Sequence, residues 1–388
     1  QKAAYELMPS LVGSEMCIRD RESGNIPLFS QEIKRFRPAF ILHCGDATDY
    51  GDTFGDFFGP WTDILKDWMV YVSPGNHDFI RGPEDYVGEY INRPDNPDTE
   101  LESYFAFDWG PLHIIAVDIP NYVEGGTFAE NVKAFLERDA LSADDHPWRI
   151  LFGHYPFYTA TEMHMLQAAL SAHSISELCD LGRIDLYFSG HVHSYQRSFP
   201  TRGGLTGPTP HGPCLFVDPH ATVYVATSLG KEVYPFAEGA IVRHLAKKEP
   251  ALTYLRVKAD YEALTVEAIE MPHGKLVDRF TIKKTHEPRE SIPPVIEKIE
   301  LTRKGRTRAF VQWETNERTV GWVKVAGCGS DFSEARKFRS GYYRRKHRVE
   351  ITSSMWERWP YCFEIVCEDL FGNRTVSERM EIPQGVVF

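Results

Sequence analysis

The sequence lacks several features that would narrow its function at once. Its seven cysteines contain no CxxC pair, which indicates neither a zinc-thiolate site nor a disulfide scaffold. No apolar run approaches the roughly 18–20 residues that span a bilayer, so we expect no membrane span. Positive charge is scarce: 43 Lys and Arg face 55 Asp and Glu, net −12. We therefore predict no nucleic-acid partner, and any phosphate chemistry needs a local positive charge.

The 388 residues, 42% of them apolar, are enough for two or three domains with sizeable cores. The chain carries net charge −16 before residue 292 and +4 from there on, which favours two domains. We predict a first domain over residues 22–287, a proline-rich linker over 288–294 and a second domain over 295–388. Residues 12–21, VGSEMCIRDR, look like adaptor nucleotides translated together with a gene, so residues 1–21 are expected to be non-native.

Four apolar runs in the first domain read as strands, and each ends in a glycine followed by a polar residue. The strands are predicted at 40–44, 69–72, 149–152 and 186–188, and the segments that follow them are GDATDYG (45–51), GNHD (75–78), GHYP (153–156) and GHVH (190–193). Because polar groups at strand ends lie in loops, these side chains are expected to share one edge of a sheet. Oxygen and imidazole ligands suit zinc, iron or manganese.

These four segments resemble the calcineurin-like metallophosphoesterase superfamily, and their surroundings resemble its purple-acid-phosphatase-like branch. The resemblance implies a four-layer α/β/β/α sandwich with two mixed sheets face to face. It also implies a pair of divalent or trivalent metal ions, with Fe, Zn or Mn as the expected metals. Asp46 would bridge the ions, Asn76, His154 and His191 would complete one metal site, and His193 would contribute to the other.

The same resemblance implies residues that act on the substrate. His77 would lie over the substrate phosphate and protonate the leaving oxygen, and Asp78 would orient His77 and raise its basicity. His164 and Arg197 are candidate substrate contacts. The remaining histidines, His113 and His146 among them, have no motif around them and are expected to be surface or hydrogen-bonded core residues.

Two departures from the family pattern concern the metal centre. The first family motif, an Asp followed two residues later by His or Gly, should lie some 30 residues before Asp46, and the sequence has no acceptable copy there; Asp20 is a poor substitute. We therefore expect one nearly complete metal site and missing ligands at the other. Purple acid phosphatases have a tyrosine ligand three residues after Asp46, where this chain has Asp49, with Tyr50 beside it.

The second domain reads as short strands separated by turns, among them strands at 309–313 and 322–325, which predicts an all-β sandwich. Residues 313–326, 347–352 and 361–373 resemble the fibronectin-type-III-like domain of purple acid phosphatases. Cys362 and Cys367 point to opposite faces of one strand and cannot pair with each other. Either could pair with Cys328, or all three could be buried thiols.

Three functions are compatible with these features. The first is hydrolysis of a small phosphomonoester through a metal-bound hydroxide. The second is a phosphodiesterase of the same superfamily that acts on nucleotides or lipids. The third is a non-catalytic surface binding module with a vestigial metal site. The family resemblance favours an extracytoplasmic or secreted protein, and the sequence indicates no oligomeric state.

Overall fold

The structure is a computed structural model of the 388-residue chain. It describes residues 10–13, 25–48, 57–79, 104–142, 146–230, 232–238, 242–285, 292–304, 308–333, 335–340, 344–352, 360–369 and 373–383. The chain divides into two compact units, Gln1–Thr201 with Thr206–Thr285, and Arg202–Leu205 with His286–Phe388. The division at residues 285–286 lies two residues before the predicted end of the first domain. Among the described residues, no helix is long and apolar enough to cross a membrane.

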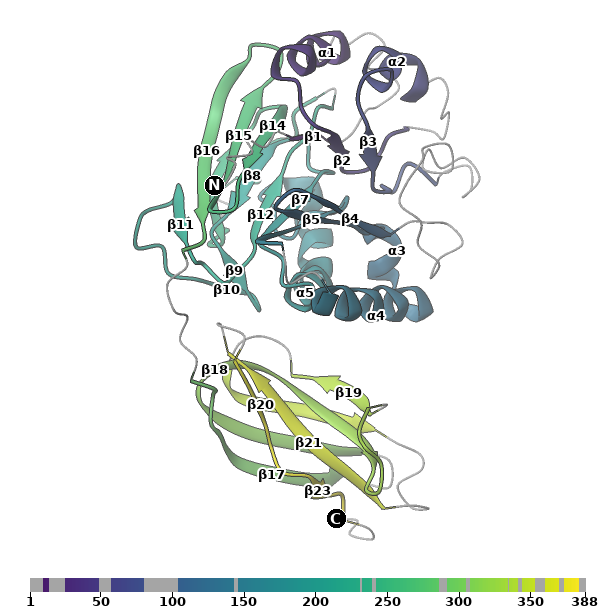
Figure 1. The fold of residues 1–388 in the computed structure, drawn as a ribbon, viewed down its shortest axis with the longest axis vertical. Coiled ribbons are helices and arrows are strands. Elements are labelled where there is room, and N and C mark those ends of the chain that lie inside the picture. The colour runs from purple at the N-terminus through teal and green to yellow at the C-terminus, as the bar shows by residue number, and fades with distance from the viewer. Residues whose placement is uncertain are drawn as a thin grey trace, which may run out of the picture. The chain divides into compact units, whose positions relative to one another are not determined.

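The first unit is built on two seven-stranded mixed sheets (Figure 1). One has the order β11 (Leu215–Val217), β16 (Lys275–Lys283), β15 (Ala263–Glu270), β14 (Thr253–Ala259), β1 (Ser10–Gly13), β2 (Ile41–His43) and β3 (Val70–Val72). The other has the order β13 (Leu245–Glu249), β8 (Tyr195–Ser198), β12 (Val223–Ala226), β7 (Leu186–Ser189), β6 (Trp148–Phe152), β5 (Leu112–Ala116) and β4 (Phe105–Trp109). The short strands β9 (Thr201–Arg202) and β10 (Leu205–Thr206) form a separate pair.

Helices cover the outer face of each sheet (Figure 1). The first sheet carries α1 (Asn25–Phe36) and α2 (Gly59–Leu65). The second carries α3 (Ile119–Glu124), α4 (Gly126–Ser142) and α5 (Met165–Leu181), with the 3-10 turn η5 (Glu162–His164) leading into α5. On α1, Ile26, Phe29 and Ile33 recur at helical spacing and are buried, so one face of this helix packs on the sheet.

Alternation along single strands explains the four layers. On β6, Ile150 packs in the core between the sheets, whereas Leu151 packs against the helices. On β2, Leu42 packs in the core between the sheets, whereas Ile41 packs against the helices that cover the first sheet. A strand buried on both faces needs apolar residues at every position, which is why these runs are continuously apolar. The expected four-layer α/β/β/α fold is confirmed.

The second unit is an all-β sandwich, as expected. It contains β17 (Ile296–Lys304), β18 (Arg308–Gly327), β19 (Arg336–Arg339), β20 (Arg344–Thr352), β21 (Tyr361–Glu368), β22 (Arg374–Val376) and β23 (Met380–Glu381). The sequence predicted two strands, at 309–313 and 322–325, where the structure has the single strand β18. Its first half pairs with β17 and β20 and its second half with β19 and β21, and the register shifts between Glu314 and Thr319. The polar residues 314–319, which read as a turn between two strands in the sequence, therefore form a corner within one strand.

The cysteine alternatives are resolved in this unit. Cys328 forms a disulfide with Cys362. Cys367 is a buried thiol whose sulfur accepts a hydrogen bond from Trp313 Nε1 at 3.1 Å, and burial raises its pKa to about 11.

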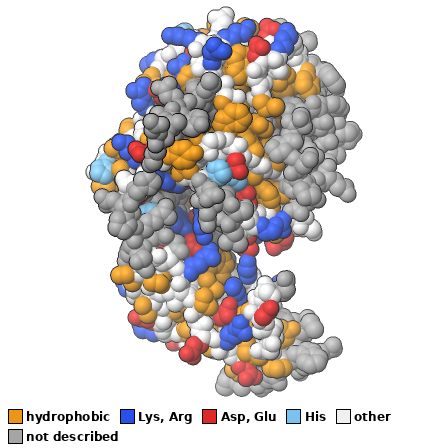
Figure 2. Space-filling model, viewed as in Figure 1, with side chains coloured by type: hydrophobic (Ala, Val, Ile, Leu, Met, Phe, Trp, Pro, Cys, Tyr) orange, Lys and Arg blue, Asp and Glu red, His pale blue; other side chains and the backbone are white. Residues whose placement is uncertain are grey.

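On the face drawn in Figure 2, Lys and Arg side chains are interspersed with Asp and Glu over the described surface, so this face carries charge of both signs.

Candidate metal centre

Loops at the carboxyl ends of four strands bring the predicted ligands together. Asp46 follows β2, Asn76 follows β3, His154 follows β6, and the segment with His191 and His193 follows β7. Since β2 and β3 belong to one sheet and β6 and β7 to the other, the site is assembled by both sheets. The predicted convergence of loops from distant parts of the sequence is therefore present in the fold.

The backbone at two of these loops leaves no room for a side chain. Gly45 has φ +93°, and a Cβ there would lie 2.7 Å from Nδ1 of His154. A Cβ on Gly75 would lie 2.2 Å from Oδ1 of Asp46. Because neither contact is tolerable, glycine at both positions is required for the two loops to approach each other. Asp46 itself has φ +53°, in the left-handed region that is uncommon for residues other than glycine.

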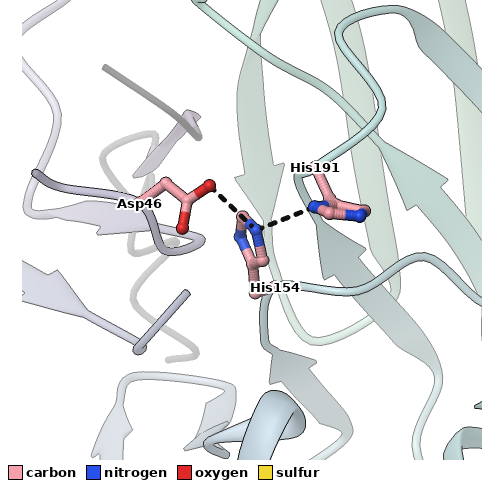
Figure 3. A group of neighbouring side chains, drawn as sticks. All are labelled: Asp46, His154 and His191. Carbon is pink, nitrogen blue, oxygen red and sulfur yellow. Dashed lines mark hydrogen bonds and ion pairs between the residues drawn. The ribbon is translucent and has the colours of Figure 1, made fainter. Parts of the chain in front are cut away.

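The ring nitrogen Nε2 of His154 lies at the centre of the group. It is 3.2 Å from Asp46 Oδ2, 3.0 Å from Asn76 Oδ1 and 3.2 Å from His191 Nδ1. Figure 3 shows Asp46 and His191 on either side of His154. Ligands held at about 2.1 Å by one ion are about 3.0 Å apart at right angles and about 3.4 Å apart at tetrahedral angles. The observed separations match those of ligands that share an ion.

Hydrogen bonds on the far side of each ring determine which nitrogen carries the proton. Nδ1 of His154 donates to the carbonyl oxygen of Cys44 at 2.8 Å, and Nε2 of His191 donates to Oε1 of Gln167 at 2.6 Å. The nitrogens that face the centre therefore present lone pairs in the neutral rings, as do the oxygens of Asp46 and Asn76. In these tautomers four acceptors face one another, and a cation satisfies them, either a proton on His154 Nε2 or a metal ion. The donor set of one carboxylate, one carboxamide and two imidazoles fits a metal ion.

Electrostatics keeps the ligands in their binding forms. Burial and the neighbouring histidines hold the pKa of His191 well below its ordinary value, so its imidazole is neutral at neutral pH. Burial alone would raise the pKa of Asp46, but His154 and His77 outweigh it and hold that pKa at about 2. Asp46 is therefore a carboxylate throughout the physiological range.

His193 lies outside the group of three ligands whose binding atoms are all within 4.8 Å of one another, which is Asp46, His154 and His191. Its Nδ1 donates to the carbonyl of Glu232 at 3.0 Å, which assigns Nε2 as the nitrogen able to bind a metal. Its ring stacks on Tyr234, with the centroids 4.1 Å apart. Burial lowers its pKa to about 4, so the ring is neutral. The alternative ligand Asp20, and Asp49 with Tyr50, lie outside the described residues.

His77 and Asp78 differ in their surroundings. The backbone N–H of His77 donates to Asp46 Oδ1 at 2.8 Å, and its ring Nε2 lies 4.0 Å from Asp46 Oδ2, with 38% of the side chain exposed. Asp78 is fully buried, and its carboxylate accepts from the backbone N–H groups of Asp46, Thr48 and Gly75 at 2.8–3.0 Å. These bonds tie the loops after β2 and β3 together, a different task from the predicted orientation of His77.

His164 and Arg197, the two predicted substrate contacts, lie in different environments. The His164 ring is 4.1 Å from that of His191, and its Nε2 is buried without a hydrogen-bond partner in the described structure, so it borders the metal centre. Arg197 is only 1% exposed; it pairs with Asp278 (Nε to Oδ2, 2.7 Å) and donates from Nη1 to the Pro213 carbonyl. The structure therefore reassigns Arg197 from a substrate contact to a core ion pair, because its donors are used inside the protein.

Sequence reasoning missed Gln167, which fixes the proton of His191 from the first turns of α5. No motif surrounds it in the sequence. Its place three residues after His164, a predicted site residue on the approach to the same helix, is the only signal that could have pointed to it.

Comparison with known proteins agrees with this geometry. Residues 22–195 match the family model of the calcineurin-like phosphoesterases. Purple acid phosphatase 18 of Arabidopsis thaliana is 26% identical over 166 residues, 40% of this chain and 36% of the relative. Purple acid phosphatase 1 of Ipomoea batatas is 27% identical over 209 residues, 49% of this chain and 43% of the relative. The match thus spans less than half the length of either relative.

A solved structure shares the fold. The purple acid phosphatase PPD1 from yellow lupin (Lupinus luteus) seeds superposes with a TM-score of 0.60 at 16% sequence identity, over 72% of this chain and 54% of that chain. At this identity the likeness concerns the architecture of the sheets and helices.

Proposed function

We propose that this chain, whose residues 22–195 match the family model of the calcineurin-like phosphoesterases, hydrolyses phosphate esters with the help of two metal ions and that its substrates are small phosphomonoesters. The observation that carries the proposal is the convergence of four metal-ligand side chains, Asp46, Asn76, His154 and His191, in which the binding atoms of the other three lie 3.0–3.2 Å from His154 Nε2. The purple acid phosphatases among its relatives support the phosphomonoester substrate.

Each side chain has a defined task in this proposal. Asp46, Asn76, His154 and His191 hold one ion, and Asp46 with His193 contributes to the second. When bound, the ions supply Lewis acidity, which activates water and neutralises charge on the phosphoryl oxygens.

His77 has the exposure and position of a proton donor. It lies beside the Asp46 carboxylate with part of its ring open to solvent, so its ring can reach the leaving oxygen of a bound ester. His164, whose buried Nε2 lacks a partner, can hydrogen-bond to the substrate from the side of His191. A leaving alcohol that is not protonated departs slowly, which is why His77 should affect the rate more than metal binding.

The test compares two site variants of the full chain loaded with Zn²⁺, Mn²⁺ or Fe³⁺. Asp46→Asn should lose bound metal and turnover together. His77→Ala should keep its metal content and lose about 10²–10⁴ in kcat, as expected for a missing general acid. His273→Ala, an exposed histidine of the same unit, serves as the control and should change neither.

The outcomes separate the competing functions. Faster hydrolysis of a chromogenic bis-ester than of the mono-ester would identify a phosphodiesterase. Metal binding without turnover on either ester would identify a binding module. Loss of metal from His77→Ala would contradict the role assigned to His77.

We further propose that the protein works in an oxidising, extracytoplasmic compartment, since disulfides persist there and are rare in the cytosol. The disulfide Cys328–Cys362 supports this. Of the seven cysteines, five thiols should react in the unfolded chain without reductant. Reaction of both Cys328 and Cys362 as free thiols in protein taken from its native source would contradict the proposal.

A further inference from the structure

A second group of metal-ligand side chains lies at the opposite end of the second sheet. Asp108 on β4 stands directly across from His113 on β5, and His113 stands across from Arg149 on β6. Side chains of directly opposed residues lie on the same face of a sheet. These three therefore form one row across the sheet, and Asp139 of α4 lies against it. His146, two residues before β6, completes the group.

The group is independent of the metal centre described above. His146 precedes β6 by two residues and His154 follows it by two, and a five-residue strand is about 17 Å long. The two groups therefore lie at opposite ends of the same strand, and neither can supply ligands to the other.

The hydrogen bonds of His113 prepare one of its nitrogens for a metal. Its Nε2 lies 2.9 Å from Asp139 Oδ2, and the same oxygen accepts a 2.6 Å bond from Nη2 of Arg149. A carboxylate fixed by an arginine, accepting the proton of an imidazole, is the arrangement that orients histidines at metal sites. In the neutral ring, this would place a lone pair on Nδ1. Nδ1 lies 2.6 Å from Asp108 Oδ1, a hydrogen-bond distance that is shorter than the roughly 3.3 Å between two ligands of one ion. The half-exposed Asp108 carboxylate would therefore turn away from Nδ1 when an ion binds.

His146 supplies the third donor. Its Nδ1 is buried, makes no hydrogen bond within the described structure, and lies 3.7 Å from Asp108 Oδ1. That separation is too long for a hydrogen bond, but it is close to the roughly 3.3 Å between two ligands of a tetrahedral zinc ion. The binding atoms of Asp108, His113 and His146 all lie within 4.8 Å of one another.

From this geometry we propose that Asp108, His113 and His146 bind a divalent transition-metal ion, with Zn²⁺ as the expected metal. Two imidazoles and one carboxylate suit zinc and exclude an all-oxygen calcium or magnesium site. Asp108 is half exposed, which leaves the fourth position for water and gives the ion a path from solvent. Such an ion would join the β4–β5 hairpin to the segment before β6, so its role is structural.

The competing arrangement is an imidazolium of His113 held between Asp108 and Asp139, with no ion. The two arrangements differ in what they require of His146: the ion needs it as a ligand, whereas the imidazolium does not use it. Replacing His146 therefore distinguishes them. Since His146 is partly exposed and makes no hydrogen bond, its removal should leave the fold intact.

The experiment uses the full chain with Asp46→Asn and His191→Ala, which disable the first centre, and adds Zn²⁺. This chain should retain one equivalent of zinc after dialysis, and zinc should raise its melting temperature. Adding His146→Ala should weaken that binding by roughly 100-fold or more and abolish the shift. Asp139→Asn should weaken it by about 10–100-fold, the usual loss for a residue that orients a ligand. His273→Ala is the control and should change nothing.

Two results would overturn the proposal. One is a chain with Asp46→Asn and His191→Ala that folds and retains no zinc. The other is an unchanged zinc affinity after His146→Ala, checked with Asp108→Asn as a second ligand variant. Neither result bears on the proposed hydrolase activity, which depends on residues at the other end of β6.

Discussion

The ion pair between Arg197 and Asp278 joins the two sheets of the first unit, and its removal is the sharpest stability test that the structure offers. Arg197 lies on β8 of one sheet and Asp278 on β16 of the other. The guanidinium lies 4.7 Å from the centroid of Phe280, within the core between the sheets. Arg197→Met keeps the length and apolar contacts of the side chain but removes its charge and every donor.

The expected loss of stability follows from the unpaired carboxylate of Asp278 that Arg197→Met leaves in the core. Asp278 is about 8% exposed and would be left with the Tyr195 hydroxyl and the backbone N–H of Arg279 as its hydrogen-bond donors. Removing one partner of a buried pair costs about 3–5 kcal/mol. In a unit of this size, each kcal/mol shifts the melting temperature by roughly 2–4 °C, so we expect a decrease of about 10 °C. Asp278→Asn in the same chain should recover most of it, because removing both charges leaves none uncompensated.

Thermal unfolding and steady-state kinetics measured on the same samples decide the matter. Arg279→Met is the matched control: this arginine is adjacent to Asp278, is 59% exposed and pairs with Glu267, and surface pairs contribute only about 0.2–1 kcal/mol. The Arg197→Met chain should be less stable with an unchanged KM. An unchanged melting temperature together with a raised KM would refute the reasoning and restore Arg197 as a substrate contact.

Three further predictions concern the metal centre and the second unit. Asp78→Asn should lower metal affinity and turnover together, each by about 10–100-fold, because Asp78 holds the loop that carries Asp46. Retained metal with slow turnover would instead indicate that Asp78 acts by orienting His77. Cys328→Ser opens a loop of 34 residues, which should cost the second unit about 3–4 kcal/mol in urea unfolding and leave the proposed phosphate-ester hydrolysis unchanged. Gly13 pairs with His43 in the parallel β1–β2 ladder, an offset of 30 residues. The same offset from Asp46 gives Met16 in the sequence, so Met16→Asp with Ile18→His should raise the metal content measured by elemental analysis. No increase would contradict the inference that the first motif is missing.

The convergence of the candidate ligands could be predicted from the sequence because each stands within a few residues of its own strand end. An apolar run, a glycine and a polar residue form a local pattern, and the ends of parallel strands must meet at one edge of a sheet. Asp46 and His154 are 108 positions apart, but no long-range information was needed to expect them at the same edge.

The partners that orient those ligands could not be predicted. Gln167 acts on His191 from a helix, and the carbonyls of Cys44 and Glu232, which accept from His154 and His193, are backbone groups that any residue type provides. Arg197 was misassigned for a related reason. Its place after the GHVH segment suggested the site, but β8 carries it away from the metal centre and into the core between the sheets.

The difference between the two groups of ligands explains why only one was visible in the sequence. Asp46 and His191 have φ values of +53° and +70°, and such backbone comes with the glycines that form a recognisable motif. Asp108 and His113 lie on regular strands, where backbone geometry demands no particular neighbour. Their proximity arises only from strand register, which a single sequence determines through the hydrophobic pattern of the whole sheet and not through any residue beside them. A ligand group built on regular strands is therefore recognised only after the register is known.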